Sequence, residues 1–394
     1  MAIGESAVCR TENITATGSG LARINDKCVF TELSAPGDLI RIRITEEQKN
    51  WARAEITEIL EPSPDRTEPF CPLYGICGGC NLQHINYEAQ LKIKKHILLE
   101  SFSRTAGISP PEPGVYSSTP AEYRNRVQFH CAANNRKQIG FKAGKGNQIV
   151  QLADCPVADP GIREALKNPR QTRLNPPVHK DRFTVYSRRD LFLSEGAISR
   201  GIITLGDSRT GFPQKSLAID AGVFFQSNAE MLEILLNDLI LIAKTCDPGL
   251  PMADIYCGVG TFSAFIGDYF DAADLVEENK TAIALARENA QGKNRGFFGL
   301  KADDWVKQKK PFEKNWGLVI LDPPRTGLTP GLRRFLETSA VKTIAYVSCD
   351  PVTLARDSET LLKAGYIIKD LNLYDFYPQT AHIESLTVFE KAQI

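Results

Sequence analysis

The sequence predicts a mainly α/β protein, in which a small all-β unit and a mixed α+β part precede a larger α/β domain with a mostly parallel sheet. Three observations predict this fold class. Residues 221–394 alternate helix-like and strand-like segments, which is typical of β-α-β units. Residues 39–44 and 51–60 alternate apolar and polar side chains with the period of a half-buried strand. Three closely spaced cysteines at 71–80 indicate a separate part between these two.

The composition restricts the class of protein. Lys and Arg total 47, as do Asp and Glu, so the formal net charge of the 394-residue chain is zero. This balance excludes a globally basic nucleic-acid coat protein and an acidic disordered chain. No apolar run approaches the ~20 residues of a membrane span, and the N-terminal sequence lacks the basic and apolar regions of a signal peptide. We therefore expect a cytoplasmic protein with neither a membrane partner nor an obligate protein partner.

Residues 1–66 are predicted to form the all-β unit. The turn sequence APGD at 35–38 precedes the strand expected at 39–44, and the strand at 51–60 follows it. A five-stranded OB-like barrel fits this length. The sequence at 61–69 contains three prolines and is predicted to be a linker.

Residues 67–220 are predicted to form a small α+β middle domain with one long helix at 87–106, ended by Gly107. Its charge is uneven, because the stretch 123–189 contains fourteen Lys or Arg residues and four Asp or Glu residues. Tyr123, Phe129 and Phe141 are interleaved with the first of these cations. This pattern suits a surface that binds phosphates and stacks bases, and the alternative is a solvated charged face.

Residues 221–394 form the predicted α/β domain. Its expected helices occupy 231–244, 278–291, 331–340 and 351–365, and its expected strands occupy 253–257, 273–276, 316–324, 342–351, 366–376 and 383–391.

The cysteines of CPLYGICGGC at 71–80 have the spacing of metal ligands. In a reducing cytosol, cysteines act as metal ligands, catalytic thiols or buried residues before they form disulfides. Cys71, Cys77 and Cys80 supply three ligands, and Cys155 in the turn-like ADCPVADP is a better fourth ligand than Cys131, which lies in a strand-like run. Four thiolates without histidine suit an iron–sulfur cluster or zinc, and unliganded cysteines are the remaining interpretation.

A glycine-rich turn follows the first strand of the α/β domain, in DIYCGVGTFS at 254–263. Such a turn lets a cofactor approach the backbone. Ser263 stands where a dinucleotide-binding fold has its third glycine, which argues against NAD. Glu277 follows the next strand, where an acid can bind ribose hydroxyls. Together these features favour S-adenosylmethionine, and a turn used only for packing is the alternative.

Three further motifs follow later strands. Asp322 in LDPPR at 321–325 comes at the carboxyl end of a strand, where open α/β sheets bind ligands. Cys349 in VSCDP ends the next strand just before a helix, whose N-terminus favours a thiolate nucleophile. Glu384 in HIES opens the last strand and is a candidate general base. The alternatives are a turn, a buried structural cysteine and an inert glutamate.

In this order, the glycine motif, LDPPR, SCDP and HIE resemble the RNA uracil-C5 methyltransferase family, which uses S-adenosylmethionine, and FFQSN at 224–228 matches as well. CPLYGICGGC with the distant Cys155 resembles the [4Fe-4S] branch of this family. The first 60 or so residues resemble its TRAM domain, an RNA-binding OB-like barrel. The resemblance covers essentially the whole chain. The cysteine motif and the TRAM-like segment indicate the ribosomal RNA enzymes, because the bacterial transfer-RNA enzyme lacks both.

The resemblance implies a Rossmann-like methyltransferase domain, a TRAM barrel and an iron–sulfur middle domain. It implies RNA as the partner, 23S rRNA ahead of tRNA, with S-adenosylmethionine and a [4Fe-4S] cluster as cofactors. The residue roles that it implies are the nucleophile Cys349, the base Glu384, the cofactor and target contacts Gln226, Tyr256, Glu277 and Asp322, and the cluster ligands Cys71, Cys77, Cys80 and Cys155.

Four alternative functions can be compared by the residues that each one requires. The same chemistry on a transfer-RNA uridine uses the same residues. Amino methylation at a D-P-P site has no use for Cys349 or Glu384. An iron–sulfur redox protein with a nucleotide cofactor predicts glycine at position 263, where the chain has serine. A non-catalytic RNA-binding module needs neither Glu277 nor Cys349.

Overall fold

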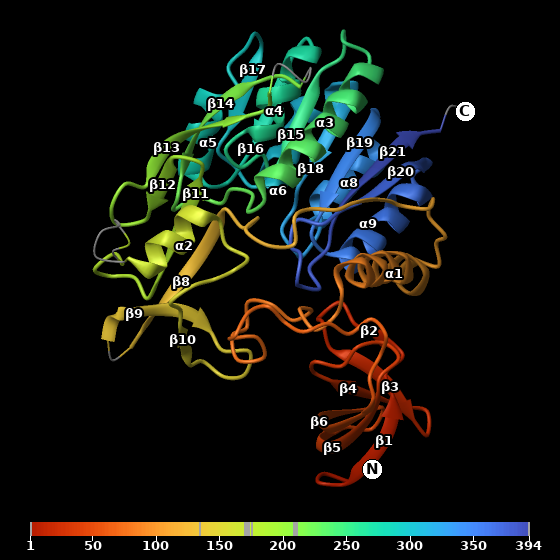
Figure 1. The fold of residues 1–394 in the computed structure, drawn as a ribbon. Helices are drawn as coiled ribbons and strands as arrows, with labels where there is room; N and C mark the ends of the chain where they lie inside the picture. Colours follow the sequence, from red (N-terminus) through yellow and green to blue (C-terminus); the bar gives the residue numbers. More distant parts are fainter. Residues whose placement is uncertain (1, 134, 169–173, 175, 208–211, 393–394) are drawn as a thin grey trace.

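The computed structural model describes the chain except for residues 1, 134, 169–173, 175, 208–211 and 393–394 (Figure 1). The described residues form an N-terminal sheet, a middle sheet, a hairpin and a large C-terminal sheet with helices on both sides. None of the described helices has the length and apolarity needed to cross a bilayer.

The N-terminal unit is all-β, with six strands in the order β1-β5-β6-β4-β3-β2. Its strands are β1 (Ser6–Arg10), β2 (Asn13–Ile14), β3 (Gly20–Ile24), β4 (Lys27–Thr31), β5 (Leu39–Glu47) and β6 (Trp51–Glu61). The predicted strands at 39–44 and 51–60 are β5 and β6. Ile40, Ile42 and Ile44 are buried and the two arginines between them are exposed, as the period of two requires. The described sheet has one strand more than the five expected.

The helix predicted at 87–106 is confirmed as α1 (Tyr87–Ala106). The Asn86 side chain caps its first turn, and Gly107 ends it in the left-handed conformation at φ 64°. Helix α1 packs against α9 (Pro351–Lys363) of the C-terminal domain. Strand β7 (Gly114–Tyr116) forms one edge of the large sheet, where it pairs with residues 372–374. The part of the chain expected in the middle domain therefore also contributes to the large one.

The middle sheet has the strand order β10-β9-β8-β11-β12 and lies beside a two-stranded hairpin. The elements of this region are β8 (Arg126–Ala132), β9 (Asn135–Lys142), β10 (Ile149–Gln151), α2 (Pro160–Lys167), β11 (Arg182–Arg188), β12 (Leu191–Ser194), β13 (Arg200–Leu205) and β14 (Lys215–Asp220).

The three aromatic residues pack in or against a hydrophobic core, so the interpretation that they form an exposed platform for stacking bases is wrong. Tyr123 and Phe129 are buried. Phe141 stacks on Phe129 with the ring centroids 5.4 Å apart. Phe129 and Phe141 lie on the paired strands β8 and β9, Tyr123 precedes β8, and interior packing explains their spacing as well as an exposed platform would.

Several cations of the same stretch have acidic partners. Arg163 pairs with Asp154 at 2.8 Å, and Arg188 pairs with Glu233, which lies outside the stretch, at 2.6 Å. Arg170 and Arg173 lie outside the described residues. The local charge surplus is therefore partly neutralised by the fold.

The large sheet has the order β17-β16-β15-β18-β19-β21-β20-β7. Its strands are β15 (Met252–Ile255), β16 (Ala273–Val276), β17 (Arg295–Phe298), β18 (Trp316–Leu321), β19 (Val341–Ser348), β20 (Tyr366–Tyr374) and β21 (Glu384–Lys391), with β7 at the edge. The strands from β17 to β19 are parallel, and β21 runs antiparallel to both β19 and β20. This confirms the predicted mostly parallel sheet.

Helices cover both faces of this sheet. In addition to α1 and α9 they are α3 (Ala229–Thr245), α4 (Thr261–Ile266), η2 (Gly267–Tyr269), α5 (Lys280–Asn289), α6 (Ala302–Val306), α7 (Lys309–Glu313) and α8 (Pro330–Thr338). Leu318 and Ile320 of β18 pack in one core with α3, α4 and α5, whereas Val319 and Leu321 pack in the other with α1, α6, α8 and α9. Strand order reverses between β15 and β18, which places a crevice at their carboxyl ends.

Candidate active site

The candidate site residues follow the strands at one edge of the large sheet. Tyr256, Glu277, Asp322 and Cys349 come directly after β15, β16, β18 and β19, which are parallel and end at the same edge. Glu384 is the first residue of β21, and because β21 is antiparallel to β19 its start lies beside the end of β19. The topology therefore brings the residues from five strands to one crevice.

A cavity of about 810 Å³ occupies this crevice, a volume in the range of small-molecule sites. All six residues expected to contact the cofactor, the target or the reacting atoms line it: Gln226, Tyr256, Glu277, Asp322, Cys349 and Glu384. Gln226 reaches the cavity from the segment that precedes α3.

Two glycines of the turn have different roles: Gly258 faces open space, and Gly260 allows close packing. A Cβ placed on Gly258, at φ 54°, would have no other atom within 4 Å, and the Gly258 N–H donates to Glu277 Oε2 at 3.1 Å. Gly260, at φ 79°, lets the turn lie against α5. Ser263, in place of the third glycine, is buried and donates its hydroxyl to Asp254 Oδ2 at 2.7 Å. The turn thus leaves Gly258 open to a ligand.

Acidic groups dominate the electrostatics of the cavity. Burial, together with Asp254 and Glu277, raises the pKa of Asp322 to about 7. Burial also raises the pKa of Asp254 to about 6, although Ser263 opposes this shift. The pKa of the buried Glu384 is well above its usual value, because of burial and then Asp322. Such a cavity favours a cationic ligand.

The Cys349 thiol has the opposite pKa shift from the one expected at a helix N-terminus. Burial, followed by the charges of Glu384 and Asp322, raises its pKa to about 12. The first N–H groups of α9 are not directed at Cys349, because Asp350 Oδ1 accepts from Val352 N at 3.1 Å and from Thr353 N at 2.8 Å. The neighbouring aspartate is therefore the group that the helix terminus stabilises.

Comparison with known proteins agrees with this geometry. A family model described as tRNA (Uracil-5-)-methyltransferase matches residues 217–392. A Treponema denticola protein described as an uncharacterized RNA methyltransferase is 34% identical, covering 98% of this chain and 100% of its own. The 23S rRNA (uracil(1939)-C(5))-methyltransferase RlmD of Edwardsiella ictaluri is 30% identical, covering 96% of this chain and 94% of its own.

The chain belongs to the RNA uracil-C5 methyltransferase family. The crystal structure of a Pyrococcus abyssi tRNA (uracil-54, C5)-methyltransferase in complex with S-adenosyl-L-homocysteine has the same fold, with a TM-score of 0.71, 23% identity and coverage of 98% of this chain and 100% of that one. The chain is thus a methyltransferase that uses S-adenosylmethionine. Membership of this family decides against the amino-methylating, redox and non-catalytic interpretations.

Several residues that line the cavity of this RNA uracil-C5 methyltransferase were not predicted from the sequence. Phe224 is exposed at the cavity wall, with the Arg126 guanidinium 5.4 Å from its ring centroid. Arg325 Nη2 lies 3.1 Å from His382 Nδ1. Tyr377 also lines the cavity. Phe224 and Arg325 lie within the motifs FFQSN and LDPPR, whereas nothing in the sequence around Tyr377 indicated its position.

The four cysteines of the predicted cluster influence one another electrostatically. Burial raises the pKa of Cys80 to about 12, and the charges of Cys155 and Cys77 act in the same direction. Cys71 likewise raises the pKa of Cys77, after burial. In the described part of the chain, no three His, Cys, Asp or Glu side chains are grouped closely enough to hold a metal ion.

Proposed function

We propose that this chain transfers a methyl group from S-adenosylmethionine to C5 of one specific uridine in RNA, through a covalent bond between Cys349 Sγ and C6 of the uracil. The observation that carries the proposal is the presence of Cys349, Glu384 and Asp322 in one cavity. A thiol, a carboxylate base and an acid that attracts a cation are the groups this reaction needs. The RlmD relatives support 23S rRNA as the substrate.

The chemistry of uracil explains why both catalytic residues are needed. C5 is a poor nucleophile until the Cys349 thiolate adds to C6 and moves the ring electrons into an enolate. S-adenosylmethionine, when bound, supplies the electrophilic methyl group that C5 accepts. Glu384 then takes the proton from C5, the electron pair re-forms the C5–C6 double bond, and the bond from C6 to Cys349 Sγ breaks. The thiolate is regenerated and Glu384 holds the proton.

The thiolate of Cys349 has to form despite its raised pKa. Asp322 and Glu384 contribute to that shift after burial, so a positive charge next to these acids favours the thiolate. A sulfonium carries such a charge. Binding of the methyl donor and activation of the nucleophile are therefore expected to support each other.

The donor is proposed to contact Gln226, Tyr256, Glu277 and Asp322. Gln226 Oε1 is buried and has no hydrogen-bond partner among the described residues, which is unfavourable unless a ligand donates to it. The open face of Gly258 lies beside the Glu277 carboxylate. These features fit a nucleoside with ribose hydroxyls and a polar base.

An Asp322→Asn exchange should weaken the binding of S-adenosylmethionine about 30-fold at pH 8, equivalent to about 2 kcal/mol for a hydrogen-bonded charge. In the wild type, affinity should rise as the pH rises through about 7, because the ionised carboxylate attracts the cation. Without ligand, the folded state binds the proton more tightly than the unfolded chain, so stability should fall as the pH rises from ~4 to ~7. The variant should lack the pH dependence of affinity and show a smaller fall in stability, because Asp254 and Glu384 also have raised pKa values.

Calorimetric titrations with S-adenosylmethionine and with neutral S-adenosylhomocysteine measure this directly. Only the first ligand should show the pH dependence in the wild type. Equal pH dependence for the two ligands would mean that Asp322 does not act on the sulfonium charge.

We also propose that Cys71, Cys77, Cys80 and Cys155 hold a [4Fe-4S] cluster that stabilises the middle domain. A set of four thiols without histidine supports this assignment over most other metals. Cys77 and Cys155 are near enough to Cys80 for their charges to raise its pKa, although the four side chains are not grouped around one point among the described residues. An isolated bridge from Cys77 to Ala143 ties the motif to the region that follows β9. Methyl transfer moves no net electrons, so the cluster needs no redox role.

Anaerobically purified protein should be brown and contain about four irons per chain. Cys155→Ser should lose both the iron and solubility. Cys131→Ser is the matched control, because Cys131 is an equally buried cysteine within β8, and it should keep both. Iron analysis and absorption spectra provide the measurement, and stoichiometric zinc without iron would refute the assignment.

The N-terminal unit is proposed to be a TRAM domain that binds RNA together with the middle domain. The proposed division of the chain is 1–66, 67–220 and 221–394, with α1 and β7 of the second part packed onto the third. The all-β character of the first part and the positive charge of the second support this arrangement.

Deletion of the gene should remove one 5-methyluridine from 23S rRNA and leave transfer RNA unchanged. Mass spectrometric mapping of both RNAs tests the proposal. Loss of a 5-methyluridine from transfer RNA instead would support the proposed reaction and refute 23S rRNA as its substrate.

A further inference from the structure

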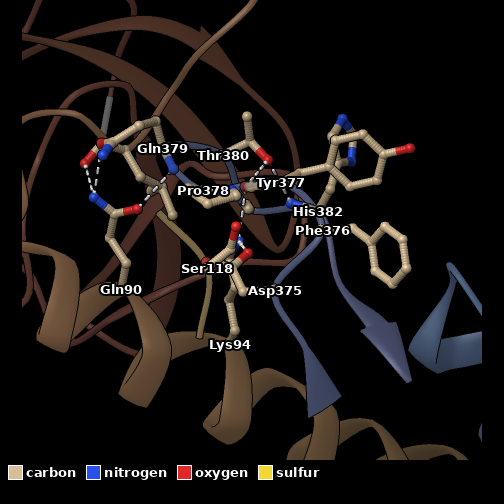
Figure 2. A network of polar contacts seen from close by, with 12 residues as sticks. Gln90, Lys94, Ser118, Asp375, Phe376, Tyr377, Pro378, Gln379, Thr380 and His382 are labelled. Carbon is tan, nitrogen blue, oxygen red and sulfur yellow. Dashed lines mark hydrogen bonds and ion pairs between the residues drawn. The ribbon is translucent and has the colours of Figure 1, made fainter. Parts of the chain in front are cut away.

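The segment 375–381 makes up most of the connection from β20 to β21, which ends at the proposed base. Tyr377 within it lines the cavity, and Glu384 follows its last residue by three positions. Figure 2 shows that this segment contacts side chains of helix α1. The proposed base is the first residue of β21 and pairs with Tyr374 of β20, so the chain enters the strand at the base only three residues after this segment ends.

One residue of the segment has a strained backbone that earlier parts of the chain hold in place. Gln379 is buried and has φ 69°, a left-handed conformation that residues other than glycine rarely adopt. Its N–H donates to Gln90 Oε1 and its Oε1 accepts from Gln90 Nε2, both at 2.9 Å (Figure 2). Its carbonyl accepts from Asn81 N at 3.1 Å and Leu82 N at 3.0 Å. Its Nε2 donates to the Pro120 carbonyl at 3.3 Å.

The start of the segment is anchored by a buried ion pair. Lys94 Nζ lies 2.6 Å from Asp375 Oδ1, and both side chains are fully buried. Lys94 Nζ also donates to the Tyr377 carbonyl at 2.9 Å, and the Tyr87 hydroxyl donates to Asp375 Oδ2 at 2.8 Å. Both lysine and tyrosine belong to α1.

The end of the segment is held by Asn81, the residue that follows Cys80. Asn81 Oδ1 accepts from Ala381 N at 3.0 Å, and Asn81 Nδ2 donates to the Thr17 carbonyl at 3.0 Å. The N-terminal unit makes room for this amide at Gly18, where a Cβ would lie 2.1 Å from Asn81 Nδ2. One side chain thus joins the N-terminal unit and the cysteine motif to the segment that precedes the base.

We propose that Asn81 is a positioning residue for proton removal, which acts by holding the Ala381 N–H and thereby the Glu384 carboxylate. Its second hydrogen bond, to Thr17, holds the N-terminal unit against the same segment. The inference rests on the proposed function, because it concerns the step that Glu384 performs. In this proposal Asn81 Oδ1 positions the segment before the base, and Asn81 Nδ2 holds the N-terminal unit. Substitutions that remove one hydrogen bond and keep the other can therefore separate the two roles.

Two variants of Asn81 make this separation. Asn81→Ala removes both hydrogen bonds, whereas Asn81→Asp keeps the acceptor for Ala381 N–H and loses the donor to Thr17. The alanine variant should lower kcat by roughly tenfold to a hundredfold, since small misplacements of a catalytic group have effects of this size. Methylated protein–RNA adduct should accumulate, because release is the step that needs the base. The aspartate variant should restore kcat, and the KM for RNA should rise alike in both variants.

Three controls accompany the kinetics. Asn315→Ala, at an exposed site outside both the cavity and the N-terminal unit, should match the wild type. The metal content of the Asn81 variants should equal that of the wild type. Hydrogen exchange without RNA should show the Ala381 amide exchanging faster in Asn81→Ala only.

Equal loss of kcat in the alanine and aspartate variants would overturn the inference, as would unchanged kcat in both. Unchanged exchange at Ala381 in Asn81→Ala would overturn its structural basis without any reference to catalysis. A wild-type protein that makes no 5-methyluridine in any RNA would instead overturn the proposed function, and with it the step assigned to Glu384.

Discussion

A Cys349→Ala variant should bind RNA and S-adenosylmethionine and yet form neither a covalent adduct nor 5-methyluridine. Without addition to C6, the ring has no enolate and C5 remains too weak a nucleophile to accept the methyl group. Removal of a catalytic nucleophile costs on the order of 10⁴–10⁶ in rate. Transfer of a radiolabelled methyl group to RNA, with binding measured separately, gives the result.

Cys246→Ala is the matched control for this experiment. Cys246 is also half-buried, but it lies at the end of α3 and its thiol contacts the Ile242 carbonyl, away from the cavity. This variant should retain full activity. Full activity in Cys349→Ala would refute the mechanism even though the chain belongs to a methyltransferase family.

Glu384→Gln should stop the reaction at a later point than Cys349→Ala does. The glutamine keeps the size of the side chain and removes its basicity, so addition and methylation proceed and loss of the C5 proton does not. A methylated protein–RNA adduct should accumulate and survive denaturing electrophoresis. Loss of a general base costs ~10²–10⁴ in rate, so slow release through water is expected.

The control for this variant lies on the same strand. Glu390 is near the other end of β21, where it pairs with Lys369 at 3.6 Å, and Glu390→Gln should turn over normally without a trapped adduct. Rapid turnover of Glu384→Gln without an adduct would show that another group removes the proton.

Much of the C-terminal fold was predictable because its strands are buried on both faces and its helices are amphipathic. The run WGLVIL at 316–321 is fully buried, as a central parallel strand should be, and it predicts β18, which ends at Leu321 rather than at the expected residue 324. The convergence of Asp322 and Cys349 followed from the same rule, since parallel strands end at one edge. The short strand β17 (Arg295–Phe298) was missed, because its four residues carry little periodicity.

Contacts between distant segments could not be predicted. The apolar positions of α1 indicated a helix, but nothing in its sequence indicated that Gln90 and Lys94 hold the segment before Glu384, some 280 residues later. The alternation of Phe129 and Phe141 fitted an exposed platform as well as a core, and only the packing decided between them. The expected stabilisation of the Cys349 thiolate by the N-terminus of α9 failed for a similar reason. The Asp350 side chain accepts the hydrogen bond from Thr353 N instead.

The central claim is that Cys349 forms a covalent bond to the target uracil during methyl transfer. RNA with 5-fluorouracil at the target position tests it, because fluorine cannot leave C5 as a cation and the wild-type adduct should persist. Digestion of the trapped complex and mass spectrometry of the modified peptide should place the bond on Cys349, with the added methyl group on the base. A nucleotide attached to any other cysteine, or methylated product without an adduct, would contradict the account.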